Sequence, residues 1–314
     1  MNLHEDKTVF IELIRATSDH YKIKSEFIEK DYWLTFVLRQ LANSNYLQNA
    51  VFKGGTSLSK AYKLIDRFSE DIDIAIISES SDSGNNVKNL LRSVEKEITQ
   101  GFIDFHLEGV TSKGSRYRKS VIQFQSSLDS TILDKLIIEV NAFANPFPFK
   151  QMELSSLVFS FLTFSKNLDY VRLYNLHPFK LNVLSLDQTL IEKMVSLIRF
   201  SFDKNPVESL SKKIRHFYDI YFLCSHMDCI KLFESNTIKI RFNKLWEHDL
   251  ALFDEPDGWK EKLVIDSPLL TDFDGVWNQL KSRYKLELTA LAYNSIPPAE
   301  LIATNFKTLL SRIR

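Results

Sequence analysis

The feature that most constrains this chain is a pair of aspartates that alternates with isoleucines, shortly after a pair of glycines. Asp71 and Asp73 lie in the run DIDIAII, where an apolar residue recurs at every second position before the final isoleucine pair. A period of two is that of a β-strand, and it places both carboxylates on one face. Gly54 and Gly55 follow a short apolar run and precede residues with helical spacing. The sequence therefore predicts a strand, a glycine turn, a helix with Thr56 or Ser57 as its N-cap, and a second strand with two carboxylates.

Two carboxylates at this spacing suit a divalent cation. They repel each other, and one would tend to stay protonated unless a cation lay between them. Mg²⁺ takes oxygen ligands and keeps positions for water and phosphate, so Asp71 and Asp73 predict a metal and nucleotide site. Glu139, in the apolar run KLIIEVNAF, is a carboxylate on a later strand. Its burial among apolar residues calls for a partner, which predicts Glu139 as a third metal ligand.

The glycine turn offers groups that bind phosphate. Gly54 and Gly55 let main-chain N–H groups approach an anion, and the positive end of the following helix attracts it further. Hydroxyl and ammonium groups nearby can hold more phosphate oxygens, and the candidates are Thr56, Ser57 and Lys60. The spacing is not that of a Walker A loop, because no Gly-Lys-Ser/Thr follows at the required interval. A lone DxD or Gly-Gly is usually a turn, so the order of these elements carries the prediction.

Periodicity along the rest of the chain predicts an α+β fold. Helical spacing comes first, then the glycine turn and a helix, then strands, and from residue 187 onward the pattern is mainly helical. We place the domain boundary near residue 182. The predicted helices lie within 8–43, 87–98, 187–202 and 208–227, and the predicted strands lie at 50–53, 71–77, 102–108, 120–126 and 133–143.

Composition excludes some classes of protein. Forty Lys and Arg residues balance forty Asp and Glu residues, so a nucleic acid would have to be held by a local patch. Cys224 and Cys229 are the two cysteines, and we expect both to be core thiols in a reducing compartment. The sequence lacks a signal peptide and any apolar run of about 18 residues, which predicts a cytoplasmic protein with no membrane partner.

A basic stretch between two predicted strands is the candidate for such a patch. The segment SKGSRYRK, residues 112–119, carries Lys113, Arg116, Arg118 and Lys119 around a glycine. Clustered cations of this kind can bind the phosphates of an RNA acceptor. The alternative is a solvated hairpin tip, since charged turns are common and Tyr117 is the only aromatic residue available for stacking on bases.

Several motifs together resemble the AbiEii/AbiGii toxin nucleotidyltransferases, which belong to the DNA polymerase β-like superfamily. The resemblance is carried by KGGTSLSKAY with RFSEDIDI, and by EKDYW, IEKMVSLIRF and RHFYDIYFL, which begin at residues 29, 191 and 215. It implies a nucleotidyltransferase core with N-terminal helices over residues 1–182, built on a polymerase β-like mixed sheet with flanking helices. It also implies that a mainly helical domain over residues 183–314 completes the active site.

Two residues of the later motifs gain a role from the resemblance. In that family, a lysine and an aspartate of the helical motifs complete the nucleotide site, and the matching positions here are Lys193 and Asp219. The residues alone allow a plainer interpretation. Lys193 would be a surface lysine near Asp187 or Glu192, and Arg215 with Asp219 would be an ordinary i,i+4 ion pair.

The activity that the resemblance implies is that of a type IV toxin-antitoxin or phage-defence toxin with a co-encoded antitoxin. It would transfer a nucleotide from an NTP to RNA, with tRNA favoured, and would use Mg²⁺ or else Mn²⁺. Asp71 and Asp73 would bind two metal ions, Glu139 would activate or orient the acceptor hydroxyl, and pyrophosphate would leave. Transfer to a protein hydroxyl and a silent nucleotide-binding module are the alternatives, and the intact carboxylate set counts against the silent module.

Overall fold

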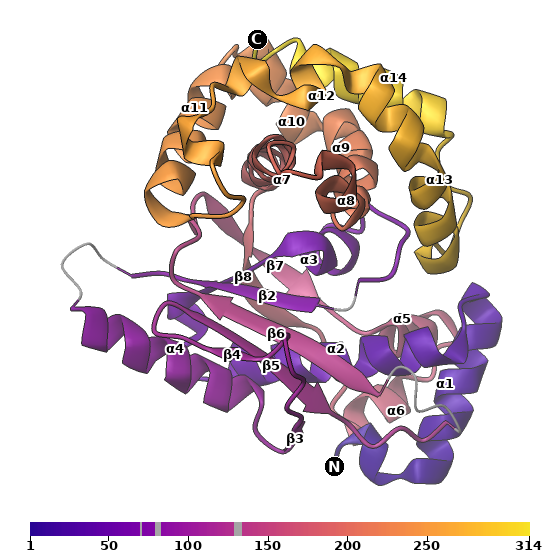
Figure 1. Ribbon diagram of the computed structural model, residues 1–314. Helices are drawn as coiled ribbons and strands as arrows, with labels where there is room; N and C mark the ends of the chain where they lie inside the picture. Colours follow the sequence, from indigo (N-terminus) through magenta and orange to yellow (C-terminus); the bar gives the residue numbers. More distant parts are fainter. Residues whose placement is uncertain (70, 79–82, 129–133) are drawn as a thin grey trace. The chain divides into compact units, whose positions relative to one another are not determined.

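The chain of the computed structural model divides into two units, described here over residues 1–69, 71–78, 83–128 and 134–314 (Figure 1). The first unit comprises Met1–Lys63 and Phe68–Leu184, and the second comprises Leu64–Arg67 and Ser185–Arg314. The short segment Leu64–Arg67 thus belongs with the C-terminal helices, although it lies between the glycine motif and the aspartate pair in the sequence.

Two helices open the first unit, which confirms the prediction for residues 8–43. Helix α1, Lys7–Tyr21, begins where the Asp6 carboxylate accepts a hydrogen bond from Val9 N, and it ends at Lys22 in the left-handed conformation. Helix α2, Ser25–Asn43, buries an apolar face of five residues at helical spacing, namely Ile28, Leu34, Val37, Leu38 and Leu41.

A mixed sheet forms the centre of the first unit. Its strand order is β3-β5-β6-β2-β1-β8-β7, with β4 paired to β5. The pairs β2–β6 and β1–β8 are parallel and the others are antiparallel, which confirms the predicted α+β class. The strands are β1 Ala50–Lys53, β2 Asp71–Ile76, β3 Ile103–Asp104, β4 Ser112–Lys113, β5 Tyr117–Gln123, β6 Lys135–Asn141, β7 Phe149–Leu154 and β8 Phe179–Leu184.

The structure differs from the sequence prediction at several elements. Helix α3, Gly54–Lys60, begins at the first glycine with Lys53 as its N-cap, so the prediction of Thr56 or Ser57 as N-cap is wrong. Strand β3 is only two residues long, whereas the alternation predicted a strand over residues 102–108. Strands β7 and β8 were both missed, although Phe179–Val183 of β8 alternates apolar with polar side chains.

Helices α2 and α4 pack against each other and against the sheet (Figure 1). Helix α4, Gly84–Ile98, buries Leu91, Val94 and Ile98, and it contacts β5 and β6. On β6, Leu136, Ile138 and Val140 are fully buried, so the residues that alternate with them lie on the other face. That other face carries Glu139. Helices α5, Leu157–Phe164, and α6, Leu168–Leu173, complete the unit.

The second unit is helical, and the segment Leu64–Arg67 is attached to it. Arg67 forms an isolated bridge with Ala292, and Tyr293 N donates to Asp66 O at 2.8 Å. The helices of the second unit are α7 Leu186–Phe200, α8 Pro206–Ser211, α9 Ile214–Ser225, α10 Met227–Glu234, α11 Ile238–Leu252, α12 Pro268–Thr271, α13 Phe273–Leu291 and α14 Ala299–Leu310. Within the described ranges, no helix combines the length and apolarity that crossing a membrane requires.

Both cysteines are free thiols in this unit. Cys229 is buried in α10, while Cys224 in α9 is half-buried. Burial raises the pKa of Cys224 to about 12 and also raises the pKa of Cys229, so both thiols stay protonated at neutral pH. Neither thiol is therefore activated as a nucleophile.

Candidate active site

Four charged residues lie in register across four neighbouring strands of the first unit. Lys53 of β1 is paired with Asp73 of β2, Asp73 with Glu139 of β6, and Glu139 with Lys119 of β5. Neighbouring strands are about 4.8 Å apart, so the row sets two carboxylates side by side between two lysines. We call these four residues the charged row. Asp71 lies two residues before Asp73 on the same face of β2, as the sequence predicted.

Gly54 is packed against the carboxylate of Asp73. Its φ angle is +79°, a left-handed conformation that side chains with a Cβ rarely adopt. A Cβ at this position would overlap Oδ2 of Asp73 and lie 2.9 Å from its Cγ. The glycine motif therefore meets the aspartate motif directly, since the turn leaves room for the Asp73 carboxylate.

The hydroxyl groups of the turn hold it in place. Thr56 Oγ1 donates to the main-chain carbonyl of Asp71, and Ser57 Oγ donates to Gly54 O at 2.9 Å. Both side chains are buried. Each hydroxyl hydrogen is already bound to a carbonyl: Thr56 fixes α3 to β2, and Ser57 closes the first turn of α3 on Gly54. Phosphate binding by the main chain of Gly54 and Gly55 stays a prediction.

Lys60 has a partner away from the charged row. Its Nζ lies 2.5 Å from Asp31 Oδ1, and the two side chains are 5% and 14% exposed. The other Asp31 oxygen accepts from Leu157 N at 2.8 Å, and burial lowers the pKa of Lys60. In this structure Lys60 is bound to Asp31, and phosphate binding by Lys60 stays a prediction. A lysine this deeply buried needs its carboxylate, and the pair ties α3 to α2 and to the start of α5.

Glu139 lies beside two side chains of β5. Lys119 Nζ lies 2.6 Å from Glu139 Oε1, and the side chains are 24% and 23% exposed. Tyr117 is diagonally opposite Glu139 in the register of β5 and β6, and its pKa is raised by burial first and then by the charges of Glu139, Asp73 and Asp71. Tyr117 therefore lies close to all three carboxylates.

The carboxylates of β2 remain the groups that fit a divalent cation. Asp71 and Asp73 share a face and lie beside the glycine turn, an oxygen donor set that Mg²⁺ prefers. In the described part of the chain, no three His, Cys, Asp or Glu side chains are arranged to hold a metal ion. Glu139 as a third ligand thus finds no support in this geometry, because its carboxylate is turned to Lys119.

The basic stretch at residues 112–119 is largely paired within the unit. Lys113 Nζ lies 3.0 Å from Glu95 Oε1, and Arg118 Nε donates to Glu95 Oε2. Burial opposes the charge on Glu95, but these bonds and one from Ser120 outweigh it and hold the pKa of Glu95 below its usual value. Lys119 is bound to Glu139, so three of the four cations have a carboxylate partner within the unit. Lys113 and Arg116 are exposed, and RNA binding by this stretch stays a prediction.

In the second unit, one buried carboxylate holds two cations. Asp219 of α9 is completely buried, and Arg67 donates to it through Nε at 2.8 Å and through Nη2 at 2.7 Å. Lys193 Nζ of α7 lies 2.9 Å from the same carboxylate. Burial by itself would raise the pKa of Asp219, but the two cations outweigh it and hold the pKa well below its usual range. We call Arg67, Lys193 and Asp219 the buried cluster.

The buried cluster shows that the surface interpretation of these residues is wrong. Lys193 is 6% exposed, and Arg215 lies 3.5 Å from Glu287 instead of pairing with Asp219. His216 lies beside the cluster. Burial and the cations Lys193 and Lys213 hold the pKa of His216 well below 6.5, so its imidazole is neutral at neutral pH.

Comparison with known proteins agrees with these motifs. The family model described as nucleotidyl transferase AbiEii toxin, type IV TA system, matches residues 36–306. The chain belongs to this family. It is therefore a nucleotidyltransferase toxin of the AbiEii family, which implies an NTP substrate and an antitoxin as its counterpart.

The solved structures to which this chain is similar are distant in sequence. MenT4, a nucleotidyltransferase toxin from Mycobacterium tuberculosis H37Rv, is 16% identical with a TM-score of 0.47, covering 96% of this chain and 99% of MenT4. JHP933 from Helicobacter pylori is 15% identical with a TM-score of 0.43, covering 92% of each chain. No curated protein sequence matches this AbiEii toxin.

Three residues at the two sites were missed by sequence reasoning. Asp31 lies in EKDYW and Arg67 in RFSEDIDI, so both were inside motifs already noted for the resemblance. Their partners, Lys60 and Asp219, could not be read from the sequence, because they lie on elements far away along the chain. Tyr117 had no signal beyond its place in a basic stretch.

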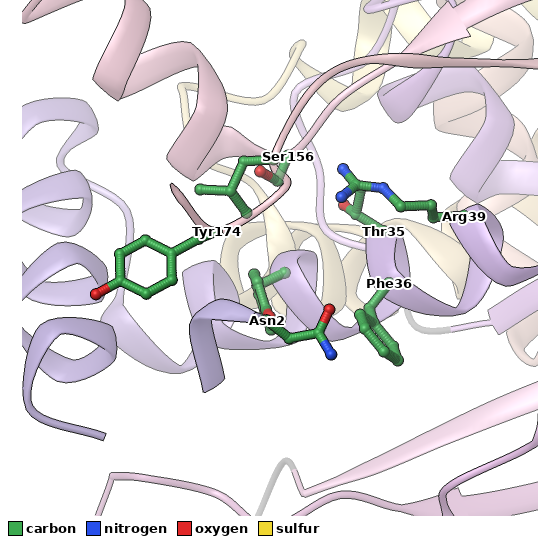
Figure 2. Close-up of a pocket in the computed structure, with 8 residues that line it drawn as sticks. Asn2, Thr35, Phe36, Arg39, Ser156 and Tyr174 are labelled. Carbon is green, nitrogen blue, oxygen red and sulfur yellow. The ribbon is translucent and has the colours of Figure 1, made fainter. Parts of the chain in front are cut away.

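A cavity elsewhere in the first unit serves the packing of the N-terminus. Its lining includes Asn2, Thr35, Phe36, Arg39, Ser156 and Tyr174 (Figure 2). Arg39 donates to the main-chain carbonyls of Asn175 and His177, and Tyr174 OH donates to Asp6 Oδ2 at 2.9 Å. The lining does not include the carboxylates of β2 and β6, so this cavity is separate from the candidate active site.

Proposed function

We propose that this AbiEii toxin transfers a nucleotide from an NTP to a hydroxyl group of RNA, with tRNA as the favoured acceptor. Asp71 and Asp73 hold Mg²⁺, for which Mn²⁺ can substitute. The observation that carries this proposal is the packing of Gly54 against the Asp73 carboxylate, since it brings the phosphate-binding turn and the metal-binding pair together. An NTP and RNA are both available in the cytoplasm, where we place the reaction.

The chemistry is a displacement at the α-phosphorus. The acceptor hydroxyl oxygen forms a bond to the α-phosphorus and releases its proton to water, while the bond from that phosphorus to the bridging oxygen breaks and pyrophosphate leaves. Asp71 and Asp73 would hold divalent cations, which would supply charge neutralisation on the phosphate oxygens. The part of this chain is to orient the nucleotide on the glycine turn and to keep Asp71 and Asp73 ionised on one face.

In the second unit, the proposal assigns different roles to the members of the buried cluster. Lys193 is the residue that serves the nucleotide, as the resemblance implies. Asp219 is a positioning residue, because a completely buried carboxylate bound to two cations has no oxygen available to a substrate.

A transfer assay tests the proposal. It combines the purified toxin with each of the four NTPs, labelled at the α-phosphate, and with total cell RNA or total protein as the acceptor. We expect transfer of label to RNA, sensitive to nuclease and resistant to protease, and abolished by chelator. Asp71→Asn and Asp73→Asn should lose transfer by about a thousandfold or more. Label in a protease-sensitive product would assign the acceptor to protein, and wild-type transfer in excess chelator would contradict the metal site.

Expression in cells gives an independent test of the toxin. The wild type without its antitoxin should arrest growth, while Asp71→Asn at the same protein level should not. Equal toxicity of the two proteins would mean that nucleotide transfer is not the cause of growth arrest. Challenge with phage in the presence of the antitoxin would then test whether this system defends its host.

A further inference from the structure

Besides Lys193, the proposed reaction needs a cation for the triphosphate near Asp71 and Asp73, and Lys60, the lysine of the first unit expected there, is bound elsewhere. Lys60 is buried in its pair with Asp31. Lys119, by contrast, is a member of the charged row, and its side chain is 24% exposed. An ammonium group has three N–H donors, so a lysine bound to one carboxylate oxygen can still donate to a phosphate.

A second side chain of β5 borders the Lys119–Glu139 pair. Tyr117 precedes Lys119 by two residues in β5, so both side chains lie on one face of the strand. Lys119 is directly opposite Glu139 in the register of β5 and β6, and Tyr117 is diagonally opposite it, within reach of a long side chain. Tyr117 is also packed against Phe143, with the ring centres 5.8 Å apart, so an aromatic side chain lies beside the ion pair.

We propose that Lys119 is a nucleotide-binding residue that donates to the triphosphate, and that Glu139 positions Lys119 instead of binding metal. This inference rests on the proposed function, because it requires a nucleotide at the Asp71–Asp73 site. It accounts for the register of the charged row, in which Glu139 separates the lysine from Asp73. Without Glu139, the ammonium would pair with the aspartates that the metal ion requires.

Four proteins test the inference in steady-state kinetics with the NTP and Mg²⁺ varied separately. They are Lys119→Gln, Glu139→Gln, the double variant, and Lys180→Gln as a matched control at an exposed lysine of β8. We expect Lys119→Gln to raise KM for the NTP by about tenfold, since a charge-assisted hydrogen bond is lost. Glu139→Gln should raise the same KM by less, and kcat and the half-saturating Mg²⁺ concentration should stay within about twofold.

The double variant separates positioning from direct metal binding. If Glu139 acts through Lys119, the double variant should have the KM of Lys119→Gln alone, because the two effects are not additive. Additive effects, a raised Mg²⁺ requirement in Glu139→Gln, or an unchanged KM in Lys119→Gln would each overturn the inference. Lys180→Gln should behave as the wild type.

A binding measurement keeps the inference testable without an acceptor. Equilibrium dialysis of each labelled NTP in the presence of Ca²⁺ should show weaker binding to Lys119→Gln than to wild type, with thermal unfolding used to verify that both are folded. Equal binding would overturn the inference. Loss of the proposed function is distinguishable, because then neither the wild type nor Lys119→Gln would transfer label, whatever their NTP affinity.

Discussion

The charged row and the buried cluster use the same kinds of side chain in opposite environments. In the charged row, Lys119 and Glu139 are each about a quarter exposed, so water can solvate either charge if the pair separates. In the buried cluster, Asp219 is completely buried and Arg67 is 2% exposed. Separating these charges would leave a carboxylate and a guanidinium without solvation, at a cost of several kcal/mol.

This difference indicates which ion pairs can exchange partners during a reaction. An ion pair that water can reach contributes little to stability, and its members can turn to a nucleotide or a metal ion at small cost. A buried pair is a fixed part of the fold. We therefore expect changes in the charged row to alter activity and leave stability intact, and changes in the buried cluster to alter stability first.

The largest effect on stability should come from Asp219→Ala. The change leaves Arg67 and Lys193 buried without their carboxylate, so the free energy of unfolding should fall by about 3 to 5 kcal/mol. Urea unfolding measures it. The matched control is Asp257→Ala, which removes an exposed partner of Lys204 and should change stability by less than about 0.5 kcal/mol. Full stability of Asp219→Ala with loss of activity would move Asp219 into direct contact with substrate.

Lys60→Met tests whether the second buried pair behaves like the buried cluster. It leaves the Asp31 carboxylate with its bond from Leu157 N alone, and we expect a loss of about 2 to 4 kcal/mol in unfolding free energy. NTP affinity of the folded protein should be unchanged, since Lys60 is bound to Asp31. Intact stability with weakened NTP binding would instead restore Lys60 as a phosphate-binding residue.

Gly54→Ala tests the contact between the glycine turn and the charged row. A side chain at a positive φ costs about 1 to 3 kcal/mol, and the new Cβ would also displace the Asp73 carboxylate. Activity should therefore fall further than stability alone explains. Gly84→Ala is the control, because a Cβ there meets no atom within 4 Å. It should leave activity unchanged, and near-normal activity of Gly54→Ala would show that Asp73 can relocate.

The smallest effect concerns pH and His216. Its pKa is well below 6.5 in the folded state, so the unfolded chain takes up a proton below pH 6.5 while the folded chain does not. The contribution of His216 to the free energy of unfolding is therefore present above pH 6.5. As pH falls below 6.5, the free energy of unfolding decreases by up to about 1.4 kcal/mol per pH unit. Besides burial, the charges of Lys193, Lys213 and Arg67 lower the pKa of His216, and the charge of Asp219 opposes them.

Comparing the wild type with His216→Gln isolates this contribution. Urea unfolding at pH 7.0 and pH 5.5 should show a smaller loss of stability in the variant, because glutamine does not titrate. Equal losses in the two proteins would mean that the His216 imidazole is protonated in the folded state as readily as in the unfolded chain.

The sequence by itself determined the elements that carry the chemistry. The alternation in DIDIAI fixed strand β2 and put Asp71 and Asp73 on one face, because successive side chains of a strand point to opposite sides. The helical spacing before the glycine motif predicted α1 and α2, and the motifs together indicated the family. These are local properties, since a periodic pattern reports the face of an element without reference to any other part of the chain.

Tertiary structure alone decided which charged groups meet. Lys60 is paired with Asp31 and Lys119 with Glu139, and both partners lie on other elements. Asp219 is joined to Arg67 across 152 residues of sequence. Strand register and helix packing determine which charged groups become neighbours. Desolvation then makes these ion pairs necessary, because a buried charge without a counter-ion is costly. A periodic pattern contains no information about that neighbour.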